Sequence, residues 1–390
     1  MEEVVLAGAV RTAIGRFQGS LSEMPASDMA AAVIREAVAR SGVEPADVGQ
    51  VIMGICGQIG DDTYLSRHAT IKAGLPTDVP AVNINRLCGS GLEAINTAAR
   101  YIETGDADVV VAGGTENMTR LPYLLQKARS GYRMGDGVVE DSMVKILSDP
   151  FSRSHMGVTA ETLADKYCVT REAQDELAVE SQRRALAAIR EGRFRDQILP
   201  LEVRVGRETK TFDTDEHPRA STVEALSAMR PAFKKDGMVT AGNASGINDG
   251  AAAVVLMSRA RAEQLGVAPQ LRLVGRAEAG VDPATMGEGP IPAVRKVLDR
   301  TGLSVADLDV IELNEAFASV ACACAAELAL PADKTNPNGG AIALGHPVGA
   351  TGAILTVKLA YELERIDGRF GLVSLCIGGG QGIATVFERV

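Results

Sequence analysis

Residues 40–48 read RSGVEPADV and residues 300–308 read RTGLSVADL, so the same pattern returns at a constant offset of 260 residues. A helical stretch precedes each match: SDMAAAVIREAVAR at 27–40 and PIPAVRKVLDR at 290–300. A short apolar run, QVIMG or DVIEL, follows each match. Coincidence can produce one such pair, but here helix, turn and strand recur in the same order. The sequence therefore predicts a duplicated α/β domain.

A second pair of strands supports the duplication. The β-run DVVVAGG at 108–114 and the β-run GLVSLCIGGG at 371–380 both end in glycines. We expect Ser27 to cap the first helix of the repeat, and Gly42 and Gly302 to end the two matched helices. Because strands alternate with helices, the pattern predicts mostly parallel sheets covered by helices. Functional residues of such sheets gather at the carboxyl ends of the strands.

The two copies are separated by a stretch of different character. This predicts an N-terminal half made of 1–118 and 247–268, an inserted domain at 119–246, and a C-terminal half at 269–390. The inserted part carries 20 Lys and Arg against 19 Asp and Glu, although the whole chain has a net charge of −10. It is either a solvated insertion or a lid whose relative positive charge suits an anionic substrate.

The composition excludes several classes of protein. The 390 residues include 40 basic and 50 acidic side chains, which argues against a nucleic-acid binder and against a protein held on membranes by charge. Aromatic residues make up 4% and Trp is absent, so platforms for stacking bases are not expected. No run approaches the roughly 18 apolar residues that a membrane span needs.

Targeting signals and cysteine usage predict a cytoplasmic protein. The start, MEEVVLAGAVRTAIG, is acidic where a secretory signal is basic, and the end, ATVFERV, carries no retention or peroxisomal tripeptide. Six cysteines lie far apart, which is not the spacing of a disulfide framework, and no CxxC pair suggests zinc. We expect a reducing compartment and no metal.

Cys88 is the first candidate for chemistry, in VNINRLCGSGLEAINTAARYI at 82–102. A strand leads into a glycine-containing turn, and a helix begins near Gly89. A thiol at a helix N-terminus has a lowered pKa and is enriched in the nucleophilic thiolate. The alternatives are a buried spectator cysteine and a dinucleotide fingerprint, although CGSGLEA lacks the third glycine of that fingerprint.

Three more candidates lie beside glycines or at the end of a strand. His346, in NPNGGAIALGHPVGATGAI, is an acid/base candidate, unless it is a surface loop histidine. Cys376 ends a β-run just before the turn GGGQG, whose backbone N–H groups could form an anion-binding nest or oxyanion hole. Asn314 and Glu315 follow the strand of the second repeat, where an amide could hold a water or polarise a carbonyl.

The remaining cysteines and histidines show no catalytic pattern. A metal site at Cys322-x-Cys324 lacks further ligands nearby. We expect these residues to be structural or to lie at the surface: Cys56, Cys168, Cys322, Cys324, His68, His155 and His217.

Several motifs together resemble the thiolase family, the acyl-CoA C-acyltransferases, and they cover essentially the whole chain in order. They are NRLCGSGLEAI at 85–95, HMGVTAE at 155–161, TAGNASGINDGAAA at 240–253, NEAFA at 314–318, GGAIALGHPVGATGA at 339–353 and CIGGGQG at 376–382. The resemblance implies an α/β fold of thiolase-like duplicated αβαβα layered domains with an inserted loop (lid) domain.

The resemblance also implies catalytic roles. Cys88 resembles the nucleophile that takes the acyl group as a thioester, and His346 resembles the base that activates it. Cys376 resembles the second acid/base, which moves a proton at the α-carbon of acetyl-CoA. Asn314 would position a water beside His346 as one oxyanion hole, and the N–H groups of Cys88 and Gly378 would form the other.

The inserted domain then becomes a platform for coenzyme A. Ser245 matches the family residue that meets the pantetheine amide, and Arg219 and Phe233 match positions that hold the adenine end. The residues implied to bind coenzyme A are Ser245, Arg219, Phe233, His155, Met156 and Phe317. Coenzyme A and acyl-CoA are substrates in this family, so no permanently bound cofactor and no metal are implied.

The pair His155 and Met156 resembles the short-chain branch, which favours an acetyl-CoA C-acetyltransferase. The nearest alternative is a broad-chain 3-ketoacyl-CoA thiolase of fatty-acid β-oxidation. Ketoacyl synthases and hydroxymethylglutaryl-CoA synthases carry other bases where this chain has Cys376. A lipid-binding protein without catalysis would lack a catalytic residue. Acyl-CoA substrates, a homodimer or homotetramer, and no nucleic-acid or membrane partner are expected.

Overall fold

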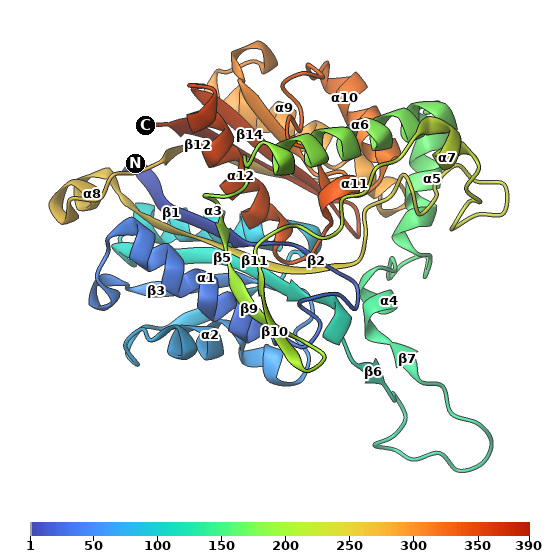
Figure 1. Ribbon diagram of the computed structural model, residues 1–390, viewed down its shortest axis with the longest axis horizontal. Coiled ribbons are helices and arrows are strands. Elements are labelled where there is room, and N and C mark those ends of the chain that lie inside the picture. Colours follow the sequence, from blue (N-terminus) through green and yellow to red (C-terminus); the bar gives the residue numbers. More distant parts are fainter. Residues whose placement is uncertain (1) are drawn as a thin grey trace.

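The computed structural model describes residues 2–390 as helices on a large twisted sheet (Figure 1). The strands are β1 (Val4–Thr12), β2 (Gly15–Arg16), β3 (Gln50–Gly54), β4 (Ala81–Ile84), β5 (Val109–Asn117), β6 (Tyr123–Leu124), β7 (Glu140–Asp141), β8 (Ile198–Leu199), β9 (Leu201–Val205), β10 (Glu208–Phe212), β11 (Asn248–Ser258), β12 (Leu271–Gly280), β13 (Val310–Leu313), β14 (Phe370–Ile377) and β15 (Gln381–Arg389). The α-helices are α1 (Ala26–Ser41), α2 (Leu65–Ala73), α3 (Ser90–Thr104), α4 (Ser142–Ile146), α5 (Met156–Lys166), α6 (Arg171–Arg190), α7 (Val223–Ser227), α8 (Arg259–Leu265), α9 (Pro290–Thr301), α10 (Ala318–Leu328), α11 (Ala341–Leu344) and α12 (Thr351–Arg365).

The sheet confirms the duplication. Its strand order is β13-β14-β15-β12-β1-β11-β5-β3-β4. Read outward from the centre, β1-β11-β5-β3 of one half corresponds to β12-β15-β14-β13 of the other. The two halves meet where β1 pairs with β12 through Val5 and Leu6. In the first half, β4 pairs with the outer side of β3. In the second half, the corresponding pairing on β13 is reduced to one parallel bridge between Ile311 and Thr335.

The expectation of mostly parallel sheets is wrong. Only the outer pairs, β3 with β4, β3 with β5, and β13 with β14, are parallel along this order. The strands β11 and β15 run antiparallel to both of their neighbours. In the second half the cause is local, because Gly379 and Gly380 have φ of 80° and 85° and turn β14 directly into β15. A tight hairpin of this kind can join only antiparallel strands.

The helices form the expected layers. The pair α3 and α12 contact each other and both halves of the sheet, while α1 and α2 cover one outer face and α9 and α10 the other. The two central helices meet backbone to backbone. A Cβ on Gly91 of α3 would lie 2.7 Å from the backbone nitrogen of Ala353, and one on Gly352 of α12 would lie 2.4 Å from that of Leu92. Glycine at both positions therefore permits the close approach.

The helix ends follow the sequence with one exception. Gly42 and Gly302 end α1 and α9 in the left-handed conformation, with φ of 76° and 69°. Ser27 does not cap α1, because the helix already begins at Ala26 after Pro25 and no side chain caps it. Pro25 supplies the extended residue that a cap position needs, so the helix begins two residues earlier than predicted.

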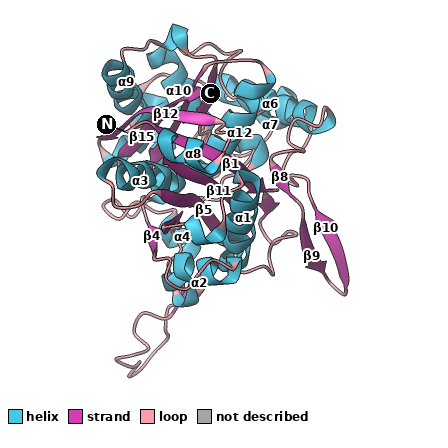
Figure 2. Cartoon of the chain, turned by 90° about the vertical axis from the view of Figure 1, so that its left-hand side faces the viewer, coloured by secondary structure: helices cyan, strands magenta, loops and turns pink. Residues whose placement is uncertain are grey.

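Two parts of the inserted segment project away from the sheet. An arm that carries β6 and β7 extends from the body in Figure 1, and the β9–β10 hairpin projects in Figure 2. The segment is tied to β1 by a buried ion pair, in which the Arg11 guanidinium donates to both oxygens of Asp215 at 2.7 and 2.9 Å. Within residues 2–390 no helix combines the length and apolar character needed to cross a membrane.

Candidate active site

One cavity of about 420 Å³ collects the predicted site residues. It opens where strands of both halves end and where the inserted segment covers them. All of the predicted site residues except Asn314 line it: Cys88, His155, Met156, Arg219, Phe233, Ser245, Phe317, His346, Cys376 and Gly378. The walls carry far more apolar than polar surface, as is usual for a cavity that takes an organic ligand.

Cys88 lies in a turn that local side chains hold in place. The residue before it, Leu87, has a φ of 47°, which is uncommon for a branched side chain. Asn85 Oδ1 accepts the N–H of Leu87 at 3.0 Å, and Ser90 Oγ accepts the N–H of Arg86 at 2.9 Å. A short 3₁₀ turn, Leu87–Gly89, then runs into α3, as the sequence predicted. The strained turn projects the thiol into the cavity.

The expected low pKa of Cys88 is not found. Burial raises the pKa of the thiol to about 11, although the backbone N–H groups of Gly378 and of Cys88 itself act in the opposite direction. Desolvation of the anion therefore outweighs the helix N-terminus. The thiol is neutral at rest, and it needs a base to become a nucleophile. The same two N–H groups point at the sulfur, where they could also meet a carbonyl oxygen on an attached acyl group.

His346 is positioned to act as that base. Its Nδ1 lies 2.6 Å from Oγ1 of Thr351, and this hydroxyl donates to the carbonyl of Pro347 at 2.8 Å. Because the hydroxyl proton is already engaged, the network assigns the ring proton to Nδ1 and leaves the lone pair on Nε2. Burial lowers the pKa of the imidazole to about 4. The ring is thus a neutral base at pH 7.

Asn314 lies beside Nε2 of His346 but does not line the cavity itself. Its Nδ2 is 3.5 Å from His346 Nε2, a long contact. Its Oδ1 is buried and has no hydrogen-bond partner within residues 2–390. A buried amide oxygen without a partner is costly and suits an ordered water. Glu315, the next residue, is engaged in structure, because it accepts from Ser181 Oγ at 2.6 Å and from Asn336 Nδ2 at 2.9 Å.

Cys376 is the second thiol of the cavity. It lies buried at the end of β14. Burial is the main cause that raises the pKa of its thiol, and the neighbouring Cys88 raises this pKa further. The turn after it begins with Gly378, whose N–H favours the anionic form of Cys88, and both thiols line the same cavity. The two thiols therefore face one cavity from opposite halves of the duplicated fold.

The coenzyme A candidates form an aromatic wall. His155 caps α5 through its Nδ1 and stacks on Phe233, with ring centroids 4.7 Å apart. Phe233 in turn meets the edge of Phe317 at 6.1 Å. The backbone of Ser245 donates to the carbonyl of Ala316 at 3.0 Å, so the loop with Ser245 pairs with the NEAFA segment.

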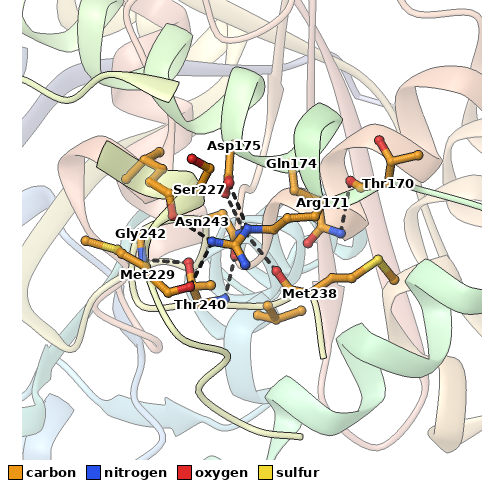
Figure 3. A network of polar contacts seen from close by, with 12 residues as sticks. Thr170, Arg171, Gln174, Asp175, Ser227, Met229, Met238, Thr240, Gly242 and Asn243 are labelled. Atoms are coloured by element: carbon orange, nitrogen blue, oxygen red, sulfur yellow. Dashed lines mark hydrogen bonds and ion pairs between the residues drawn. The ribbon is translucent and has the colours of Figure 1, made fainter. Parts of the chain in front are cut away.

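A polar network fixes the start of that loop to α6 (Figure 3). Asn243 donates to Asp175 at 2.8 Å and to the carbonyl of Met238 at 3.1 Å, while it accepts the N–H of Thr240 at 2.8 Å. Arg171 completes the network with a 2.7 Å bond to Asp175. The wall that carries Ser245 is thereby held rigidly against the body.

Sequence reasoning missed two residues of this region. His217 was expected to be structural or at the surface, but it lines the cavity. Glu116 was not singled out, yet its buried carboxylate accepts the N–H groups of Cys56, Gly57 and Gly349 at 2.9 to 3.0 Å. Its place at the end of a β-run, two residues after the paired glycines of VVVAGGTENM, was the only available signal.

Among residues 2–390, the other cysteines do not belong to groups of side chains that could bind a metal. Cys324 donates to the carbonyl of Gly287 at 3.3 Å, and Cys322 contacts the carbonyl of Ala173 at 3.8 Å. Cys168 is exposed between two helices. In the part of the chain that the structure describes, no three His, Cys, Asp or Glu side chains converge as metal ligands would.

Comparisons with known proteins match both halves of the chain to one family. Residues 4–260 match the N-terminal domain of thiolases, and residues 267–389 match the C-terminal domain. The chain is 54% identical to the beta-ketothiolase BktB of Cupriavidus necator over 391 residues, which cover 100% of this chain and 99% of that protein.

Two solved structures are similar throughout. The acetyl-CoA acetyltransferase of Bacillus anthracis has a TM-score of 0.98 at 47% identity, with 100% of this chain and 99% of that chain covered. Human mitochondrial 3-ketoacyl-CoA thiolase in complex with CoA has a TM-score of 0.96 at 42% identity, with 100% and 98% covered.

Proposed function

The chain belongs to the thiolase family, and on that premise we propose that its cavity transfers an acyl group in two stages through a thioester on Cys88. The chain is an acyltransferase that acts on acyl-CoA substrates. One observation carries the assignment of roles: a neutral imidazole with its lone pair on Nε2, the thiols of Cys88 and Cys376, and the N–H groups of Cys88 and Gly378 share one cavity. These are the groups that thioester chemistry requires.

Acylation is the first stage. His346 Nε2 takes the proton of the Cys88 thiol, and the sulfur attacks the carbonyl of acetyl-CoA. The N–H groups of Cys88 and Gly378 hold the oxygen that becomes negative. The carbon–sulfur bond to coenzyme A breaks, and Cys376 gives its proton to the departing thiolate. The products are acetyl-Cys88, free coenzyme A, a protonated His346 and a thiolate on Cys376.

Condensation is the second stage. The Cys376 thiolate removes a proton from the acetyl carbon of another acetyl-CoA, and protonated His346 with a water on Asn314 holds the enolate oxygen. The enolate carbon attacks the thioester, the bond to Cys88 breaks, and acetoacetyl-CoA leaves. The Cys88 thiolate recovers its proton from His346, which restores the starting state. The same steps in reverse cleave a 3-ketoacyl-CoA.

The substrate that we propose is acetyl-CoA, so the enzyme is an acetyl-CoA C-acetyltransferase. Support comes from the Bacillus anthracis relative of that name and from the volume of about 420 Å³, which the pantetheine arm must share with the acyl group. Met118, Leu147 and Val348 narrow the cavity around Cys88. The alternative, a broad-chain 3-ketoacyl-CoA thiolase, is favoured by the name of the human relative.

A rate comparison separates these two substrates. We expect kcat/KM for thiolysis to fall steeply from acetoacetyl-CoA to a C8 3-ketoacyl-CoA. A flat or rising kcat/KM out to longer chains would establish the broad-chain enzyme instead.

Labelling tests the thioester itself. Mixing with acetyl-CoA should place an acetyl group on Cys88, and acetyl-CoA should protect that residue from iodoacetamide. Mass spectrometry that locates the acetyl group on Cys376 or elsewhere would overturn the assignment of roles.

The remaining expectations join the proposal. The boundaries 1–118 with 247–268, 119–246 and 269–390 are proposed as the functional division of the chain, with the middle part as the coenzyme A platform. A homodimer or homotetramer is supported by β4, which is an outer strand of the sheet, and by exposed apolar side chains on the arm, such as Tyr123 and Met134. Light scattering would test this, and a monomer would contradict it. A cytoplasmic location stays a prediction.

A further inference from the structure

Asn248 connects three parts of the chain through one buried amide. It is the first residue of β11, and its side chain is inaccessible to solvent. Its Nδ2 donates to the carbonyl of Gly15 in the N-terminal half at 3.0 Å and lies 3.5 Å from Nδ1 of His217 in the inserted segment. Its Oδ1 accepts the backbone N–H of His346 in the C-terminal half at 3.0 Å.

The backbone around this amide leaves it no freedom. Gly345 has a φ of 109°, and a Cβ there would lie 2.4 Å from Cγ of Asn248. A Cβ on Gly246 would lie 2.9 Å from Oδ1 of Asn248. These contacts also determine the orientation of the amide. If the amide were flipped, its NH₂ group would face the N–H of His346, and its oxygen would face the carbonyl oxygen of Gly15. The amide oxygen therefore faces His346.

The loop that carries His346 is held at three places. Glu116 accepts the N–H of Gly349 at 2.9 Å, and Thr351 holds the ring of His346 through Nδ1 at 2.6 Å. Asn248 alone among these residues binds the backbone of His346 itself. The backbone contact and the ring contact together determine where Nε2 lies.

We propose that Asn248 is a positioning residue for His346, which aligns Nε2 with the Cys88 thiol. This rests on the proposed function, in which Nε2 is the base. Asn248 does not line the cavity, so it acts through His346 and not on the substrate. Its loss would leave a buried N–H without an acceptor and would release the backbone. A misplacement of about 1 Å costs about 10²-fold in rate.

The exchange of labelled coenzyme A into acetyl-CoA tests the role, since it needs only the first stage. We expect Asn248→Ala to lower kcat of exchange about 10²-fold and to leave KM for acetyl-CoA within about threefold, because Asn248 does not line the cavity and its contact with the cavity residue His217 is long, at 3.5 Å. The matched control is Asn338→Ala, which removes another buried amide, bonded to Glu362 at 2.7 Å and Arg193 at 2.8 Å and absent from the cavity. It should lower the melting temperature comparably and keep kcat.

Asn248→Asp provides a second, conservative variant. One carboxyl oxygen still accepts the N–H of His346, and the other must carry a proton in order to donate to Gly15. We expect kcat near that of the unsubstituted enzyme at pH 6 and a progressive loss at higher pH, as this carboxyl ionises. The unsubstituted enzyme should lack that ionisation, and a variant that was merely destabilised would not acquire it.

The outcomes are distinguishable. No exchange in the unsubstituted enzyme would overturn the proposed function, and this inference with it. Normal exchange together with equal kcat in Asn248→Ala and Asn338→Ala would overturn the positioning role alone. A change confined to KM would do the same, since it would assign Asn248 to binding. If Asn248→Ala does not fold, the pH profile of Asn248→Asp decides between the same outcomes.

Discussion

Replacing Cys376 by alanine should separate the two stages of the reaction. Cys376 lies at the end of β14, and the proposed acylation uses it only to protonate the departing coenzyme A. A thiolate departs without protonation, so coenzyme A exchange through Cys88 should fall by no more than about tenfold. Removal of a proton from the acetyl carbon has no substitute base. Condensation should therefore fall by about 10²–10⁴-fold, or roughly 3–5 kcal/mol in activation free energy.

His346→Ala should impair both stages. Burial raises the pKa of the Cys88 thiol to about 11, so little thiolate forms without a base. Loss of the imidazole also removes one donor from the enolate oxygen. We expect exchange and condensation each to fall by about 10²–10⁴-fold.

The assays are incorporation of labelled coenzyme A into acetyl-CoA and deuterium exchange at the acetyl methyl. The matched control is Cys324→Ala, which removes a thiol that is equally buried but bonded to the carbonyl of Gly287 outside the cavity. It should leave both rates unchanged. If Cys376→Ala abolished coenzyme A exchange as completely as His346→Ala does, the division of labour between the two groups would be refuted.

Three further predictions concern ionisation and packing. Burial lowers the pKa of His346 to about 4, whereas the unfolded chain takes up this proton near pH 6.5. The free energy of unfolding should therefore decrease as pH falls from about 6.5 towards 4. Calorimetry that showed no such decrease in this range would contradict a neutral His346 ring. Gly91→Ala should destabilise the protein by about 1–3 kcal/mol in denaturant titrations, because the new Cβ would lie 2.7 Å from a backbone nitrogen of α12, whereas Gly280→Ala, with nothing within 4 Å, should be nearly neutral. Asp215→Ala should cost about 3–5 kcal/mol of unfolding free energy, because it leaves the Arg11 guanidinium buried and unpaired; a loss below about 1 kcal/mol would show that water reaches this pair.

The sequence by itself determined the features that depend on neighbouring residues. Gly42 and Gly302 end their helices because only glycine enters the left-handed conformation without cost. A glycine at the end of a helical pattern therefore predicts the end of the helix from the sequence alone. The duplication was legible because two copies of one fold keep the same order of helix, turn and strand. The motifs placed Cys88 and Cys376 at the ends of strands, and the structure has Cys88 just after β4 and Cys376 at the end of β14. His346 instead lies in the glycine-rich loop between α11 and α12, from which it reaches the same cavity.

Strand direction and protonation were decided by the tertiary structure. The antiparallel course of β11 depends on where the inserted segment returns to the sheet, about which no local pattern carries information. The pKa of Cys88 was expected to be low from its helix, but it is high because residues distant in sequence bury the thiol. The role inferred for Asn248 likewise arises only when Gly15, His217 and His346 converge on one amide. Burial and hydrogen bonding between distant segments are properties of the folded chain, so they become visible only after folding.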